Sequence, residues 1–250
     1  MTAQPQTQTQ EKGNKPTFIT KQATNKLASR CDDMQELIRQ LIAIRDTCQQ
    51  YGKALESRLG ENIIANDPRC GCFAMIFNFS TLNLELIDHY VGFWGRPFMG
   101  SEEDAERLRE ENRQRCIEQT KMLFSGSMSS IEFCAKESIK LHPQSAFGQS
   151  IVLLARKKRI YLSDVIKESS NKGLISKQEE DKWDRLIWLR NLLVHNNGVA
   201  DKDDTYVIDS VTVNLKNGTM IQGNLEIFSS LVESSVELYN SWIGNLEKQP

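Results

Sequence analysis

The segment from Ser176 to Gly198 most constrains the fold, because both of its ends carry helix-capping signals. Ser176 is followed three residues later by Glu179, which is the spacing of a capping box at a helix N-terminus. Asp181 adds negative charge near the same end, where it suits the helix dipole. Gly198 follows Asn197 and is typical of a helix stop. The sequence therefore predicts one helix between these positions.

Arg190 is the unusual residue of this predicted helix, because it lies among apolar side chains. At about 100° per residue, Trp183, Ile187 and Val194 all project within about 60° of it. A guanidinium keeps its charge and is costly to bury alone. We therefore expect Arg190, in the middle of an apolar stripe, to meet a carboxylate, a neighbouring subunit or an anionic ligand such as phosphate.

Asn191 and His195 are four residues apart and share the helix face next to the arginine. The run R-N-L-L-V-H-N-N-G, with its lead-in from Leu162 to Ser176, resembles the HEPN superfamily. The signature of that superfamily is an arginine, usually followed by a polar residue, and a histidine after four to six intervening residues. Here four residues separate Arg190 from His195, and the polar residue is Asn191. The resemblance covers about Tyr161 to Asp201 and is weak in the N-terminal part of the chain.

The resemblance implies a helical domain that forms a homodimer, in which two such motifs face each other across one composite cleft. Many members are metal-independent ribonucleases, which implies catalytic roles for Arg190, Asn191 and His195 on an RNA substrate. A histidine can take the proton of a ribose 2′-OH or protonate the leaving oxygen, and an arginine can stabilise the charged phosphorane. Asn191 would orient His195 or bind phosphate. The expected setting is a toxin or defence system, with an antitoxin or regulatory protein as a candidate partner.

A second interpretation of the same residues needs no catalysis. A buried arginine and a histidine at a helix C-terminus can serve as an ion pair and a cap, since a cation suits that helix end. Some HEPN relatives are thought to bind rather than cleave. The alternative function is therefore a non-catalytic module for RNA binding, nucleotide binding or dimerisation.

The predicted helix also carries apolar residues on two sides. They are Trp183, Ile187, Trp188 and Leu192. One side can pack on its own bundle while the other meets a second copy of the chain, so we expect a symmetric dimer.

The composition is typical of one soluble globular unit. The chain has 250 residues, of which 39% are hydrophobic and 26% are charged, with a net charge of −2. This charge argues against coating nucleic acid by bulk electrostatics, so any RNA contact must be local. Apolar runs fall short of the length that a membrane span needs, and the N-terminus lacks a signal-peptide pattern. We therefore expect a cytoplasmic protein without a membrane partner.

The cysteines and the known motifs predict neither a metal nor a cofactor. The six cysteines are expected to be reduced thiols, because a chain of this length can build a core without disulfides. Cys70 and Cys72 have no second Cys or His pair nearby that would complete a zinc site. The sequence also lacks the phosphate-loop, H-E-x-x-H and G-x-S-x-G motifs.

Three regions are expected along the chain. Residues 1–20 form a tail whose Gln- and Thr-rich start predicts disorder. Residues 21–100 form a helical region with a long amphipathic helix from Thr24 to Leu59 and an apolar helix from Phe73 to Trp94. We favour bundle packing over a dimerising coiled coil for the first helix, whose seven-residue series is Leu27, Met34, Leu41, Cys48 and Leu55. Residues 101–250 form the HEPN-like helical bundle.

The third region begins with a helix that Ser101 caps and that runs to about Ile139, either unbroken or interrupted near Gly126. Glu132 in this helix is a candidate partner for Arg190, or else a solvated glutamate. A later run of four cations is either a solvated helix end or a contact for the RNA backbone. It consists of Arg156, Lys157, Lys158 and Arg159.

A β-rich stretch at about 205–223 interrupts the helical pattern. The sequence predicts strands from Tyr206 to Leu215 and from Thr219 to Gly223, joined by a turn at Asn217-Gly218. Asn224 then caps a last helix. The expected fold class is all-α, a helical bundle with a small inserted β-hairpin.

Overall fold

The computed structural model describes residues 21–94, 100–221 and 223–249, and side chains from Met34 onward within these ranges except those of residues 93 and 94. The predicted disordered tail, residues 1–20, lies outside the described residues. So does the side chain of Leu27, the first member of the seven-residue series. The described part is helical apart from one two-stranded antiparallel sheet, which confirms the expected fold class.

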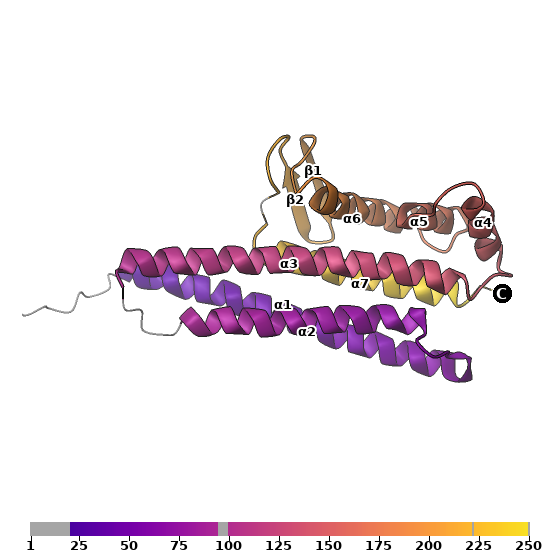
Figure 1. Ribbon diagram of the computed structural model, residues 1–250, viewed down its shortest axis with the longest axis horizontal. Helices are drawn as coiled ribbons and strands as arrows, with labels where there is room; N and C mark the ends of the chain where they lie inside the picture. The colour runs from indigo at the N-terminus through magenta and orange to yellow at the C-terminus, as the bar shows by residue number, and fades with distance from the viewer. Residues whose placement is uncertain (1–20, 95–99, 222, 250) are drawn as a thin grey trace, which may run out of the picture.

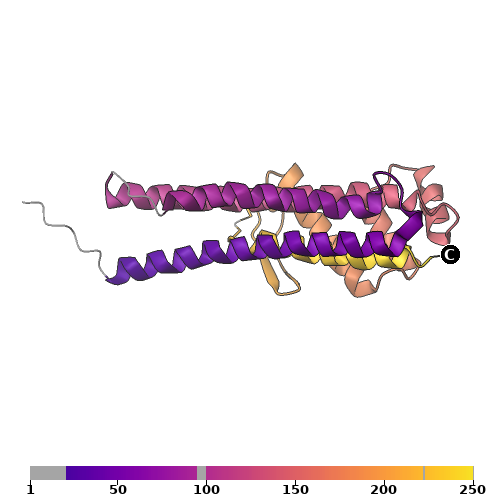
Figure 2. The same ribbon diagram turned by 90° about the horizontal axis from the view of Figure 1, so that it is seen from below.

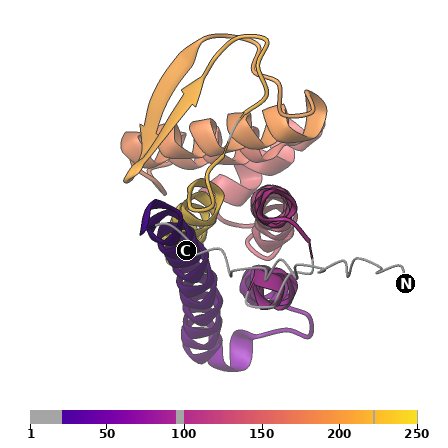
Figure 3. The same ribbon diagram turned by 90° about the vertical axis from the view of Figure 1, so that its left-hand side faces the viewer.

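Four helices form the main bundle. They are α1 (Lys21–Leu59), α2 (Pro68–Trp94), α3 (Glu102–Ile139) and α7 (Ile227–Leu246). Figure 2 shows α1 and α2 side by side along their length, and Figure 3, viewed along the bundle, shows α3 and α7 above them. Each of α1 and α3 contacts both α2 and α7, so the four helices enclose one core.

Apart from a short 3-10 helix, Gly60–Asn62, between α1 and α2, the remaining elements form a second layer over α3 and α7, on the side away from α1 and α2 (Figure 1). This layer contains α4 (Ala146–Ala155), α5 (Leu162–Asn171) and α6 (Lys177–His195), followed by strands β1 (Asp204–Ile208) and β2 (Val211–Leu215). Helix α6 packs on both α3 and α7. The layer therefore brings the segment with the arginine and the histidine onto the surface of the main bundle.

The long N-terminal helix packs within its own chain. Met34, Leu41, Cys48 and Leu55 of the seven-residue series are all fully buried. They belong to one hydrophobic cluster that extends to Leu246 of α7 and so crosses the expected boundary at residue 100. Burial of this series inside one chain supports bundle packing over a dimerising coiled coil.

Helix α3 is one unbroken helix, which decides between the two predicted alternatives. Its N-terminus has the expected cap, since the Ser101 hydroxyl accepts a hydrogen bond of 3.1 Å from the Asp104 N–H. Gly126 lies inside the helix, and a Cβ atom there would lie 3.4 Å from the Phe79 ring of α2. The glycine therefore lets two helices approach closely and does not break α3.

A buried ion-pair cluster ties the bundle together at one end. The Arg69 guanidinium contacts the Asp67 carboxylate and, at 3.0 Å, Glu247 just after α7. Burial acts to raise the pKa of Asp67, but the hydrogen bonds from Arg69 outweigh it and hold that pKa below its ordinary value. The Arg69 Nη2–H also donates to the Asn62 carbonyl at 2.9 Å. The loop before α2 is thus fixed against the C-terminal end of α7.

The β-hairpin is present, but its predicted turn is wrong. The single predicted strand Tyr206–Leu215 folds back on itself, and Ile208 pairs with Val211 across a two-residue turn. Asp209 in this turn has a φ of 52°, and its carboxylate contacts Lys182 of α6 and the Ser234 hydroxyl of α7. These long-range contacts hold the turn at Asp209. Asn217-Gly218 forms a later turn that leads to a bridge between Val199 and Met220.

Helix α2 differs from the sequence analysis in two respects. It begins at Pro68 and not at Phe73, and it is long and apolar enough to be a candidate membrane span. On length and composition alone, Pro68–Gly92 could cross a membrane, with a mean hydropathy of 1.4. The same composition occurs in core helices of soluble proteins, and α2 packs against both α1 and α3. The absence of a membrane partner and the cytoplasmic location therefore stay predictions.

Candidate functional site

Helix α6 has the predicted boundaries. The Ser176 hydroxyl accepts from the Glu179 N–H at 3.2 Å, and the Ser176 N–H donates to the Glu179 carboxylate at 2.8 Å. The other Glu179 oxygen accepts from the Ser241 hydroxyl at 2.9 Å, which connects this cap to α7. At the other end Gly198 has a φ of 74° and closes the helix by donating to the Leu192 carbonyl at 3.0 Å. Local capping thus decides where the site residues lie along α6.

Arg190 lies at the edge of the apolar face of α6, not at its centre as predicted. In the last two turns the fully buried residues are Leu189 and Leu192, and Arg190 beside them is only partly buried. The reason is that α6 packs on α3, α5 and α7, which makes its buried surface wide. The buried apolar residues of α6 follow one line, Trp183, Leu186, Leu189 and Leu192, and Arg190 flanks this line.

Arg190 is held by neutral groups. Its Nη1–H donates to Asn191 Oδ1 at 3.1 Å, and its Nη2–H donates to the Ser129 hydroxyl of α3 at 3.1 Å. Its Nε is buried without a hydrogen-bond partner. Glu132, the candidate partner of Arg190, pairs instead with Lys136 one turn along α3. Across the described residues, Arg190 has no carboxylate within ion-pair distance, so its charge is not neutralised.

His195 is the last residue of α6, and its side chain is exposed. No hydrogen-bond partner of its ring occurs in the part of the chain that the structure describes. The amide oxygen of Asn191 accepts from Arg190, so only its NH₂ group is left for either predicted role, orienting His195 or binding phosphate. Both roles stay predictions. Both nitrogens of His195 are accessible for proton transfer.

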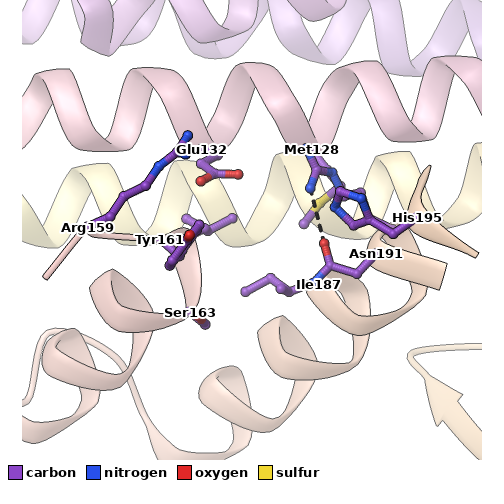
Figure 4. Close-up of a pocket in the computed structure, with 10 residues that line it drawn as sticks. Met128, Glu132, Arg159, Tyr161, Ser163, Ile187, Asn191 and His195 are labelled. Carbon is purple, nitrogen blue, oxygen red and sulfur yellow. Dashed lines mark hydrogen bonds between the residues drawn. The ribbon is translucent and has the colours of Figure 1, made fainter. Parts of the chain in front are cut away.

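One pocket of about 600 Å³ brings the three motif residues together, and its volume suits a small ligand or a nucleotide. Figure 4 shows Asn191 and His195 on one side of the pocket and Arg159 and Tyr161 on the other. Ile187 of α6 and six residues from α3, α5 and the segment before α5 complete the lining. The six are Met128, Glu132, Arg159, Tyr161, Leu162 and Ser163.

The four residues of the basic run are all exposed, and only Arg159 lines this pocket. Lys158 pairs with Asp164 at the start of α5, and it lines a second pocket together with Arg159. Arg156 occupies the C-cap position of α4, with Lys157 next to it. The RNA contact of the run stays a prediction.

Sequence reasoning missed Ser129, Tyr161 and Ser163 as residues of this site. Ser129 lies in a run of small residues on α3, which is the only local signal that another helix approaches there. Tyr161 lay at the edge of the motif resemblance, but no pattern connected it with His195. Their proximity follows from the packing of α5 and α6 on α3.

The second apolar side of α6 is covered by the chain itself. Trp188 packs edge-on against Tyr206 of the hairpin, with 5.9 Å between ring centroids, and Lys202 Nζ lies 4.8 Å from the centre of the Trp188 ring. The Arg185 Nη1–H donates to the Val207 carbonyl at 2.6 Å. The inserted hairpin therefore covers the side of α6 that carries Trp188. The symmetric dimer itself stays a prediction.

Within the described ranges, no three His, Cys, Asp or Glu side chains lie close enough together to hold a metal ion. The five cysteines whose side chains are described are free thiols, and Cys72 is fully buried. Comparisons with known proteins found no matching family model, no matching curated protein and no matching solved structure.

Proposed function

We propose that this chain is a metal-independent endoribonuclease of the HEPN type. The observation that carries the proposal is one pocket that holds both a cation without an ion-pair partner and a histidine without a hydrogen-bond partner among the described residues. The Arg190 guanidinium has no carboxylate partner among the described residues, and His195 has accessible ring nitrogens beside it. A cation next to a proton acceptor suits an RNA phosphate and its neighbouring 2′-OH.

The proposed reaction is an internal transfer at phosphorus. His195 removes the proton of the ribose 2′-OH, and the 2′ oxygen then attacks the adjacent phosphorus. Arg190 and the Asn191 NH₂ group donate to the phosphorane oxygens, which carry the developing charge. The bond to the 5′ oxygen breaks as that oxygen receives a proton from a second acid. The products are a 2′,3′-cyclic phosphate and a 5′-OH.

The wild-type protein tests this function directly. We expect it to cleave single-stranded RNA in the presence of EDTA and to leave a 2′,3′-cyclic phosphate end, which mass spectrometry of the products identifies. A substrate with 2′-deoxyribose at the cut should resist cleavage, and DNA should be untouched. Activity that EDTA abolishes and Mg²⁺ restores would contradict the mechanism, because it would require metal ligands in place of the His195 proton transfer.

The second acid is assigned to His195 of a second copy. One chain supplies one histidine to the pocket, so two pockets that face each other would supply both an acid and a base. Two exposed apolar residues support such contact: Val194, next to His195 on α6, and Met122 of α3, which lines a separate pocket with Leu193 of α6.

For the dimer we expect light scattering at micromolar concentration to give twice the chain mass of 28.6 kDa. Val194→Glu should yield the monomer and reduce cleavage, because a carboxylate would have to be buried at the contact. Val207→Glu is the matched control, since this hairpin valine is 49% exposed, close to the 45% of Val194. A wild-type protein that scatters only as a monomer would exclude the composite cleft.

One observation favours the alternative function, a non-catalytic module that binds RNA or a nucleotide. No group in the described residues orients His195, whereas catalytic histidines usually have such a partner. A module of this kind would bind RNA with an affinity that falls as salt rises, and would not cleave it in any buffer. The same wild-type assay distinguishes the two functions.

A further inference from the structure

Tyr161 is an aromatic residue on the pocket wall that the proposed reaction does not use. Its side chain is 51% exposed, although its neighbour Leu162 is buried. It lies across the pocket from Asn191 and His195 (Figure 4). A half-exposed aromatic ring in a pocket of nucleotide size offers a flat apolar surface to a ligand.

The backbone of Tyr161 is fixed by the start of α5. The Tyr161 N–H donates to Asp164 Oδ2 at 3.0 Å, and the other oxygen of Asp164 pairs with Lys158. Burial acts to raise the pKa of Asp164, but the hydrogen bonds from Lys158 and Tyr161 outweigh it and keep that pKa below its ordinary value. Asp164 therefore stays ionised and holds the backbone of Tyr161 in place. The backbone position from which the ring projects is thus set before any ligand binds.

Two cations border the ring. The Arg159 guanidinium carbon lies 5.5 Å from the ring centre, and Lys136 Nζ lies 5.8 Å from it. Lys136 is also paired with Glu132, whereas Arg159 has no ion-pair partner in the ranges that the structure describes. An aromatic ring beside a guanidinium is the combination on which proteins stack unpaired nucleobases.

We propose that Tyr161 and Arg159 form a nucleobase subsite of this pocket. A base next to the scissile phosphate stacks on the Tyr161 ring and the Arg159 guanidinium, while the phosphate lies toward Arg190 and His195. Glu132 lines the same pocket and offers a carboxylate acceptor, which suits the amino group of adenine, cytosine or guanine. A base in a duplex is already stacked, so the subsite selects single-stranded RNA.

This inference rests on the proposed function and names its substrate class. Stacking on an aromatic side chain contributes a factor of about 5 to 150 in affinity per base. The expected loss on removing the ring is therefore measurable in a binding assay. Removing the ring should not change the affinity for an oligomer that has no bases.

The test measures binding of a fluorescently labelled pentaadenylate RNA by anisotropy, with His195→Ala present in every variant to prevent cleavage. Tyr161→Ala should weaken binding about 5- to 150-fold, while Tyr161→Phe should stay within about two-fold, because stacking needs the ring and not the hydroxyl. Phe133→Ala is the matched control. Phe133 is an exposed aromatic residue of α3, 56% exposed, that does not line the pocket.

A second oligomer of the same length, with abasic ribose at every position, separates the contribution of the bases to binding from that of the backbone. Tyr161→Ala should leave its weak binding unchanged. An equal loss on both oligomers, or no loss on pentaadenylate, would overturn the subsite. So would a His195→Ala protein that does not bind pentaadenylate.

The cleavage assay keeps the two proposals distinguishable. Ring-dependent binding by a wild-type protein that never cleaves would exclude the ribonuclease and support the subsite. Cleavage of pentaadenylate that Tyr161→Ala leaves at the wild-type rate, with unchanged affinity, would support the ribonuclease and exclude the subsite. Circular dichroism of each variant checks that the helical fold is intact.

Discussion

Replacing His195 with alanine is expected to abolish RNA cleavage and to leave RNA binding nearly unchanged. General acid or base catalysis by one side chain contributes about 10²- to 10⁴-fold to a rate, and a dimer would lose two such groups at once. Binding depends instead on the Arg190 guanidinium, which keeps its hydrogen bonds to Ser129 and Asn191. Single-turnover cleavage and fluorescence anisotropy measure the two properties separately.

His89→Ala provides the control for this experiment. His89 is an exposed histidine of α2 and does not line the pocket, so its loss should leave the cleavage rate unaltered. The His195→Ala variant should also keep its melting temperature, because the exposed ring has no hydrogen-bond partner among the described residues. Full cleavage by His195→Ala would rule out this histidine as the proton carrier.

Arg190→Lys is expected to lower the cleavage rate about 10²- to 10³-fold, as observed when a donor to a charged transition state is removed. The planar guanidinium donates to Ser129 and Asn191 from two nitrogens, and its charge is not neutralised by any carboxylate in the described residues. A lysine has a single terminal nitrogen and cannot reproduce this geometry at the phosphate. The rate should be measured under single-turnover conditions together with a thermal melt.

The fold should tolerate this change. Losing the hydrogen bond to Ser129 costs about 0.5 to 1.5 kcal/mol, which lowers the melting temperature of a chain of this size by about 1 to 6 °C. Arg185→Lys is the matched control, because Arg185 is on the same helix but contacts the hairpin. A variant with a large fall in melting temperature would instead assign Arg190 a structural role. An Arg190→Lys variant with wild-type activity and wild-type stability would show that Arg190 does not act in the site.

Features that depend on neighbouring residues could be predicted from the sequence. The start of α6 follows from hydrogen bonds between Ser176 and Glu179, and the start of α3 from the Ser101 cap. The end of α6 follows from the positive φ that Gly198 tolerates. All these contacts form within a few residues, so the local sequence pattern is sufficient to predict them.

The spacing of the three motif residues was also predictable, since the helical repeat alone places Arg190, Asn191 and His195 near one end of α6. Their partners were not. Ser129 is 61 residues away from Arg190 along the chain, and nothing in the sequence distinguishes it from the other serines of α3. Glu132 was the better candidate on charge, yet Lys136 on the same helix pairs with it.

Amino-acid order by itself thus determined the long helices α1, α2, α3 and α6, the caps of α3 and α6, and the residues that α6 displays together. Only the tertiary structure decided what faces them. Packing of α5 and α6 on α3 placed Tyr161 and Arg159 across from His195, and folding of the hairpin over α6 covered Trp188. The position of the hairpin turn also depends on tertiary contacts, because Lys182 of α6 and Ser234 of α7 contact the Asp209 carboxylate. Local hydrogen bonds form within a few residues, whereas these contacts exist only after separate helices have packed together.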